Sequence, residues 1–229
     1  VLRVWNRSAG KLSANAQARI AMDLLTQDLE TAVFRNNELQ WLRAEDITLK
    51  DGSVKTVALK LFSPALDRPS GDGDICAIAY ALENRNPVTG ATGAGLSDNR
   101  LWILYRLVAS PKDTFDNLMG SGNQETLPGG TGNWGSNRII GEDSSGNFGA
   151  NYLVSNVVGF EIDFHVEDDA TAGGTLVPGD TIYGGTDARV GPQSSLADEF
   201  KKPLAYAEIK LTVITDEGAS LLQNLDKIK

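Results

Sequence analysis

Apolar residues recur every three or four positions between residues 13 and 36. This stretch contains no Gly or Pro, begins with Ser13 at a position suited to cap a helix, and carries Arg35 in its last turn. Such spacing collects apolar side chains on one side of an α-helix. The pattern therefore predicts one long amphipathic helix, whose apolar face is formed by Ala14, Ala18, Ala21, Met22, Leu25, Leu29, Ala32 and Val33.

Beyond residue 36 the apolar positions alternate with polar ones, which is typical of strands with one buried face. The runs 75–82 and 101–108 are apolar on both faces, so we expect them to be central strands covered by the helix. The predicted fold class is α+β, with the long N-terminal helix packed on an antiparallel β-sheet. Strands are expected at residues 38–43, 54–62, 74–82, 100–109, 154–166 and 204–215.

Two segments, 114–151 and 167–203, are rich in Gly, Asp and Ser and are expected to form long loops. Loops of this length in compact domains either bind something or are tolerated surface insertions, and both interpretations stay open. Residues 216–229 are expected to form a turn and a short C-terminal helix. The whole chain, 1–229, is predicted to be a single domain whose sheet spans residues 38–215.

Composition narrows the function classes. The chain has 229 residues, 41% of them apolar, and 21 basic against 30 acidic residues give a formal charge of −9. Nucleic-acid binding depends on clustered positive charge, so nucleic acid is not an expected partner. The apolar run 75–82 is far shorter than the roughly 20 residues of a membrane-spanning helix. Its single cysteine, Cys76, is expected to be a buried small side chain rather than a reactive thiol.

Motifs for catalysis are weak. The glycines Gly130, Gly132 and Gly135 match a dinucleotide-binding spacing, but no strand precedes them and no helix follows, so we reject that interpretation. The only histidine, His165, lies in a predicted strand among acidic residues and has no motif serine near it. A hydrolase would need a site assembled from distant residues, and the sequence predicts no enzyme and no catalytic residue.

Metal and cofactor sites are not predicted either. The side chains of Glu161, Asp163, His165 and Glu167 project from one side of a strand, but neighbours two apart are about 7 Å from each other. Pairing across the strands with Lys210 is the simpler interpretation. Calcium remains an alternative at three acidic loop sequences, none of which has EF-hand spacing: Asp72 with Asp74, Glu142 with Asp143, and Asp168 with Asp169.

Three aromatic residues, Trp134, Phe148 and Tyr152, lie in or beside the first Gly-rich segment. Exposed rings in a loop can stack on sugars, which makes a surface adhesin or carbohydrate-binding module the alternative function. The same rings can instead anchor the loop to the domain.

Three segments together resemble a known family. Residues 17–33, with Asp28 and Leu29 followed by Ala32, resemble the helix that follows the membrane span in J-type minor pseudopilins of type II secretion. The sequence LWILYRL at 101–107 resembles that family's Leu-Tyr-Arg strand, and residues 157–164 and 203–213 resemble its two closing strands. The chain is particularly similar to the Verrucomicrobia-type pilin-like cassette proteins, which have the same layout with enlarged loops.

This resemblance implies a non-enzymatic pilin-like or minor pseudopilin subunit of a type II secretion or type IV pilus-like assembly. It implies a full-length protein anchored in the inner membrane by an apolar helix preceding Val1 and displayed in the periplasm or at the cell surface. Its partners would be other pilin or pseudopilin subunits, with host or environmental glycans as further candidates. The predicted interface residues are Arg19, Asp23 and Glu30 on the helix, and Trp134 in the loop.

Overall fold

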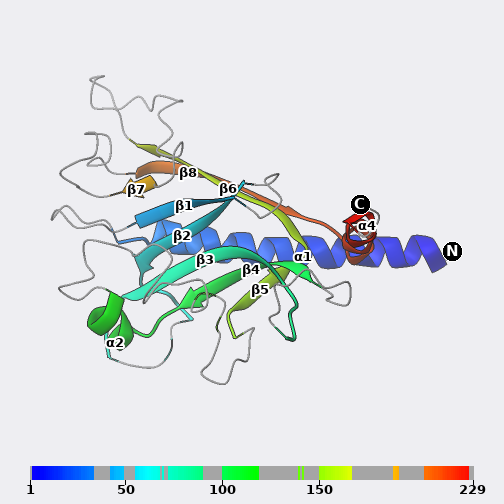
Figure 1. Cartoon of the computed structure of the whole chain (residues 1–229). Coiled ribbons are helices and arrows are strands. Elements are labelled where there is room, and N and C mark those ends of the chain that lie inside the picture. The colour runs from blue at the N-terminus through cyan, green and yellow to red at the C-terminus, as the bar shows by residue number, and fades with distance from the viewer. Residues whose placement is uncertain are drawn as a thin grey trace.

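The computed structural model describes residues 2–33, 42–48, 55–67, 69, 72–89, 100–118, 139, 141, 150–166, 188–190 and 204–226. Within this part of the chain, helices and antiparallel strands form a mixed α+β architecture, as the sequence predicted (Figure 1). The elements, in chain order, are α1 (Leu2–Glu30), β1 (Leu42–Thr48), β2 (Lys55–Ser63), β3 (Cys76–Arg85), β4 (Leu101–Val108), α2 (Pro111–Asp113), η1 (Thr114–Leu118), β5 (Tyr152–Ser155), β6 (Val157–Val166), β7 (Ala188–Val190), β8 (Leu204–Val213) and α4 (Asp216–Asp226).

The strands form two sheets, and every described pairing is antiparallel. The larger sheet has the order β5-β4-β3-β2-β1-β7, so its first five strands are neighbours in both sequence and space. The smaller sheet pairs β6 with β8. The run 75–82 lies in β3, which has partners on both sides, and its side chains from Cys76 to Leu82 are all buried. The prediction that this run forms a central strand is confirmed.

Apolar side chains fill both faces of the larger sheet. One cluster lies on the face of α1 and also includes β6; its buried members are Ala21, Leu25, Leu42, Leu59, Leu61, Ala65, Cys76, Ile78, Tyr80, Leu82, Leu104, Val154, Val157, Phe160 and Ile162. A second cluster, formed by the alternate positions of the same strands, contains Phe62, Ala77, Ala79, Ala81, Ile103, Tyr105, Leu107, Ala109, Leu118 and Ile139. Cys76 is 0% exposed, in agreement with its predicted role as a buried small side chain.

Helix α1 lies along the first of these faces and contacts β2, β5 and β8. Figure 1 shows that its earlier part, in dark blue, continues beyond the ends of the strands, and that α4 lies beside this extension. The contact is close at Gly10, where an added Cβ atom would lie 3.9 Å from the Cβ atom of Thr215, the residue before α4. The chain therefore returns at its C-terminal end to the projecting part of its first helix.

The bounds of α1 differ from the sequence-based expectation of residues 13–36. The helix begins at Leu2, since residues 2–12 contain only one strong helix-disfavouring residue, Gly10, so Ser13 lies inside the helix instead of capping it. It ends at Glu30 because the backbone amide of Val33 donates to the carbonyl oxygen of Phe62 in β2 (2.8 Å) instead of to a helical carbonyl. A contact with the sheet therefore ends the helix six residues early.

The predicted strand 154–166 is two strands in two sheets, separated by Asn156. Its φ of 59° is the left-handed conformation, which Asn tolerates better than most residues. The backbone oxygen of Asn156 accepts a hydrogen bond from Ile214 (2.9 Å), and its side chain bonds Asp216. The chain turns from the larger sheet into the smaller one at this residue, which alternation of apolar positions alone does not reveal.

The two expected loops contain short regular elements. Strand β7 lies within 167–203 and pairs with β1, but three residues are too few to show alternation. Helical structure also extends from Pro111 to Leu118, past the expected loop start at 114. Here Ser110 accepts a hydrogen bond from the Asp113 amide (3.2 Å) and Pro111 takes the first helical position, a capping signature visible in the sequence. The remaining residues of both expected loops lie mostly outside the described part of the chain.

Candidate functional site

A buried carboxylate interrupts the apolar face of α1. Asp28 follows Ala21 and Leu25 at helical spacing, and it is only 2% exposed. A charge in an apolar interior is costly unless it is paired and hydrogen-bonded. The position of Asp28 therefore requires a cation from the sheet.

That cation is Arg106 of β4. Arg106 lies directly opposite Tyr80 of β3 in the strand register, and both side chains are on the α1 side of the sheet. Strand periodicity places them there, because Ile78, Tyr80 and Leu82 alternate with the alanines of the opposite face. Two adjacent central strands thus present a guanidinium and a phenol to the helix.

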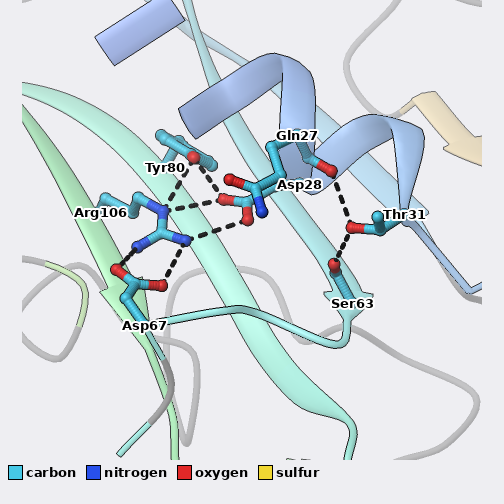
Figure 2. Close-up of polar contacts among 7 residues, drawn as sticks. All are labelled: Gln27, Asp28, Thr31, Ser63, Asp67, Tyr80 and Arg106. Atoms are coloured by element: carbon cyan, nitrogen blue, oxygen red, sulfur yellow. Dashed lines mark hydrogen bonds and ion pairs between the residues drawn. The ribbon is translucent and has the colours of Figure 1, made fainter. Parts of the chain in front are cut away.

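The three side chains form a closed set of hydrogen bonds, shown in Figure 2. Arg106 donates from Nε to Asp28 Oδ2 (2.8 Å) and from Nη2 to Asp28 Oδ1 (3.0 Å), a bidentate pair. Tyr80 donates its hydroxyl proton to Asp28 Oδ2 (2.5 Å) and accepts from Arg106 Nε (2.9 Å). Both carboxylate oxygens of Asp28 are therefore satisfied within the core.

A second carboxylate, Asp67, completes the group. It lies in the turn after β2 and accepts from Arg106 Nη1 (2.6 Å) and Nη2 (3.1 Å). Its side chain is 53% exposed, whereas those of Asp28 and Arg106 are 3% and 6% exposed. We refer to Asp28, Asp67, Tyr80 and Arg106 as the Arg106 cluster. It joins the helix, two strands and a surface turn through one guanidinium.

The pKa values of Asp67, Tyr80 and Arg106 keep these three groups in one protonation state at neutral pH. Hydrogen bonds from Arg106 hold the pKa of Asp67 below its ordinary value of 3.8. Burial, followed by the charge of Asp28, raises the pKa of Tyr80 well above its ordinary 10.0. Burial alone would lower the pKa of Arg106, but hydrogen bonds to Asp28 and Asp67 raise it above its ordinary value. The Tyr80 phenol therefore stays a donor and Asp67 stays ionised over the physiological range.

The end of α1 is attached to β2 by a second set of contacts, also visible in Figure 2. The Thr31 hydroxyl donates to the backbone oxygen of Gln27 (2.7 Å) and lies 2.6 Å from the Ser63 hydroxyl. Because Thr31 has a single hydroxyl proton, Ser63 is the donor in the second bond. Together with the bond from Val33 to Phe62, these contacts set the axial position of the helix on the sheet.

The Arg106 cluster is therefore a positioning device. Its central groups, Asp28, Tyr80 and Arg106, are buried and bonded to one another, and burial raises the pKa of the Tyr80 phenol so that it stays a hydrogen-bond donor. The cluster controls the rotation of α1 about its axis and its axial position on the sheet, since a bidentate pair tolerates little displacement. The outward face of that helix is then presented in one defined orientation.

The three helical residues that we predicted as interface residues lie on this outward face. Arg19, Asp23 and Glu30 are all exposed, as is Leu12, which is 70% exposed. Spacings of seven, four and seven residues from Leu12 to Glu30 align them in one stripe, opposite the buried face. Their role in an interface stays a prediction. The fourth predicted residue, Trp134, lies outside the described residues, so the structure does not bring it to the stripe.

Metal-binding groups are not found among the described residues, where no three acidic, His or Cys side chains gather. Asp72 and Asp74 are exposed, while the other two acidic loop sequences lie outside the described part. The predicted pairing of Glu161 is confirmed: Lys210 Nζ lies 3.1 Å from its Oε2 across β6 and β8.

Of the three loop aromatics, Trp134 and Phe148 lie outside the described residues. The third, Tyr152, begins β5 and is 44% exposed. Sugar binding stays a prediction.

Sequence reasoning used Asp28 and Arg106 only as members of two family-like segments and did not predict their contact. A usable signal existed, since each is a charge inside an apolar pattern and the two charges are opposite. Tyr80 lies within the apolar run 75–82, where an aromatic residue does not interrupt the pattern. Asp67 lies in a turn, where a charged residue is ordinary, so neither residue could be recognised as part of a cluster.

Among the described residues, no helix is both long enough and apolar enough to cross a membrane. Comparison with models of protein families found no matching family, and comparisons with curated proteins and with solved structures found no significant match.

Proposed function

We propose that this chain is a single pilin-like domain, a non-enzymatic subunit of a type II secretion pseudopilus or type IV pilus-like assembly. It acts through protein–protein contacts made by α1, with an N-terminal helix preceding Val1 that anchors the full-length protein in the inner membrane. The domain is then displayed in the periplasm or at the cell surface. Its partners are other pilin or pseudopilin subunits.

One observation carries this proposal: α1 is held rigidly at one end and projects with an exposed face at the other. From Ser8 to Ile20 every residue is exposed or half-buried, and Leu12 and Ile20 are 70% and 58% exposed. Large apolar side chains on a fixed helix are suited to packing against a neighbouring helix. The segments that resemble J-type pseudopilins also contain both partners of the ion pair that orients this helix, Asp28 and Arg106.

The test is assembly of the full-length protein in the source cells after charge reversal on the stripe, with Arg19→Glu, Asp23→Lys and Glu30→Lys combined. Co-purification of cross-linked partner subunits from the membrane fraction should be lost, because the exposed charges face the neighbour. The matched control reverses another exposed pair away from α1, Lys112→Glu with Asp116→Lys, and should leave co-purification unchanged. Assembly that persists with the triple variant contradicts the interface.

Mass spectrometry of the mature N-terminus tests the anchor separately. A methylated first residue opening an apolar segment of about 20 residues that continues into Val1 is the expected result. An N-terminus near Val1, or one left by an ordinary secretory cleavage, contradicts the proposed membrane anchor.

A further inference from the structure

A pocket of about 490 Å³ opens between the turn after β3 and the helix α4. Pro87 and Val88 from the turn, Leu101 from β4 and Ala219 from α4 supply apolar walls. The volume is within the range of pockets that hold small ligands or inserted side chains. The pocket lies apart from the Arg106 cluster and from the interface stripe, and neither accounts for it.

The polar part of the pocket contains hydrogen-bond acceptors. Asn156, which is 6% exposed, donates from Nδ2 to Asp216 Oδ1 (2.6 Å). That bond leaves the amide oxygen of Asn156 buried with no partner among the described residues. The bond from Asn156 holds the Asp216 carboxylate beside the pocket, and Asp216 itself is exposed. The left-handed backbone at Asn156 (φ 59°) turns the chain at this corner, and the bond to Asp216 fixes the Asn156 side chain there.

The charge of the pocket favours a positively charged ligand. Among the described residues that line it, Asp216 is the only charged one, and the adjacent Glu217 is also exposed. The first turn of α4 thus already carries two carboxylates, and Thr215 Oγ1 accepts the bond from the Gly218 amide (3.2 Å). These groups satisfy the helix N-terminus and disfavour an anion. A cation with several N–H donors complements the pocket.

We propose that this pocket binds the guanidinium group of an arginine side chain presented by a partner protein. The planar guanidinium donates to the Asp216 carboxylate, which the Asn156 amide holds in place, while its alkyl stem packs against Pro87 and Leu101. The turn supplies an apolar and accessible part of the pocket wall, since Val88 is 83% exposed. A charged anchor surrounded by apolar contacts is the usual form of a strong interface residue.

The proposal rests on the pocket alone and does not require assembly through α1. The first experiment titrates the chain with N-acetyl-arginine methylamide and follows backbone and side-chain amide signals by NMR. The neutral isostere N-acetyl-citrulline methylamide is the ligand control. Arginine should shift the signals of Asn156, Ala219 and Ser220 and bind about tenfold more tightly than citrulline, as expected for a charge-assisted bond. Equal binding of the two compounds, or shifts elsewhere, overturns the proposal.

Protein variants sharpen the test. Asp216→Asn should weaken arginine binding about tenfold, whereas Glu217→Gln, which removes the same charge one residue away, should change it less than about twofold. Equal losses would mean general charge attraction and would overturn the site. Ser220→Trp, an exposed substitution that fills the pocket, should abolish binding while the folded amide spectrum is kept. Unchanged binding in this variant also overturns the site.

A third experiment tests whether the natural ligand is an arginine side chain of a partner protein or a free guanidinium compound. The tripeptide acetyl-Leu-Arg-Leu-amide should bind several-fold more tightly than the single arginine derivative, because a flanking leucine can pack on the exposed side chain of Val88. No gain in affinity would overturn the partner-protein part of the proposal.

Discussion

The two halves of α1 differ in what surrounds them. In residues 21–30, the anchored half, Ala21 and Leu25 are each 1% exposed and Asp28 is 2% exposed. In residues 2–20, the projecting half, no described side chain from Ser8 onward is buried, although Gly10, Ala14 and Ala18 continue the same inward stripe. One continuous helix is thus part of the core at one end and mainly surface at the other.

This difference shows how the core can hold one helix in a fixed orientation while part of that helix stays exposed for contacts with another molecule. An isolated helix is only marginally stable in water, so the anchored half must supply most of the packing that keeps the projecting half helical. The Arg106 cluster also fixes the orientation of α1, because apolar contacts alone permit small rotations and shifts of the helix on the sheet. Substitutions in the anchored half should therefore change the stability of the fold. Substitutions of exposed side chains in the projecting half should leave the stability nearly unchanged and alter what the helix contacts.

The largest expected effect is in the ion pair. Replacing Asp28 with Ala leaves the buried Arg106 with only the exposed Asp67 as a carboxylate partner, so the free energy of unfolding should fall by about 3–5 kcal/mol. The matched control is Asp23→Ala, an exposed Asp on the same helix, which should stay within about 0.5 kcal/mol of the parent. Urea denaturation measures both. Similar losses of unfolding free energy in the two variants would contradict the proposal that the buried face of α1 is stabilising and its exposed face is not.

The second-largest loss of stability is expected in the apolar core of the anchored half. Leu25→Ala should lower the free energy of unfolding by about 2–5 kcal/mol, because it opens a cavity between α1 and the sheet. Leu12→Ala, the same change in the projecting half, should alter it by less than about 0.5 kcal/mol. Denaturant titration of both variants tests the comparison. A large loss at Leu12 would mean that the projecting half is a structural part of the core.

A smaller effect of opposite sign is expected at Gly10. Gly10→Ala should raise the free energy of unfolding by about 0.5–1 kcal/mol through helix propensity, and the new Cβ atom would meet Thr215 at an ordinary 3.9 Å. Gly73→Ala is the control: its φ of 113° and a Cβ atom 2.9 Å from Pro111 make that change destabilising. Thermal unfolding distinguishes the two. Destabilisation by Gly10→Ala would mean that the new Cβ atom is not accommodated against Thr215, contrary to the spacing of 3.9 Å.

The smallest effect belongs to Asp67, the exposed member of the cluster. Asp67→Asn should cost about 0.2–1 kcal/mol at pH 7, because solvent screens the pair. The folded pKa of Asp67 is below 3.8, so its contribution is present above that pH and is lost as the pH falls through the folded value. The difference between Asp67→Asn and the parent should therefore shrink in acid. Unfolding titrations between pH 7 and pH 3 measure it, and in an Arg106→Met background the substitution should have no effect at any pH.

Much of the secondary structure could be predicted because local spacing carries it. The stripe from Ala14 to Val33 predicted the helix, and the doubly apolar run 75–82 predicted a central strand, since both follow from periodicity. The boundaries could not be predicted in the same way. Val33 leaves the helix because Phe62 of a distant strand accepts its amide bond, and Asn156 divides one alternating run between two sheets.

The sequence by itself determined which residues are apolar at helical or strand spacing, and hence the α+β class and the outward position of Arg19, Asp23 and Glu30. Only the tertiary structure decided that Asp28, Asp67, Tyr80 and Arg106 meet. Asp28 and Arg106 are 78 residues apart. The physical reason is that periodicity records which side of an element is buried, whereas an ion pair depends on the register between elements, which the packing of the whole core sets.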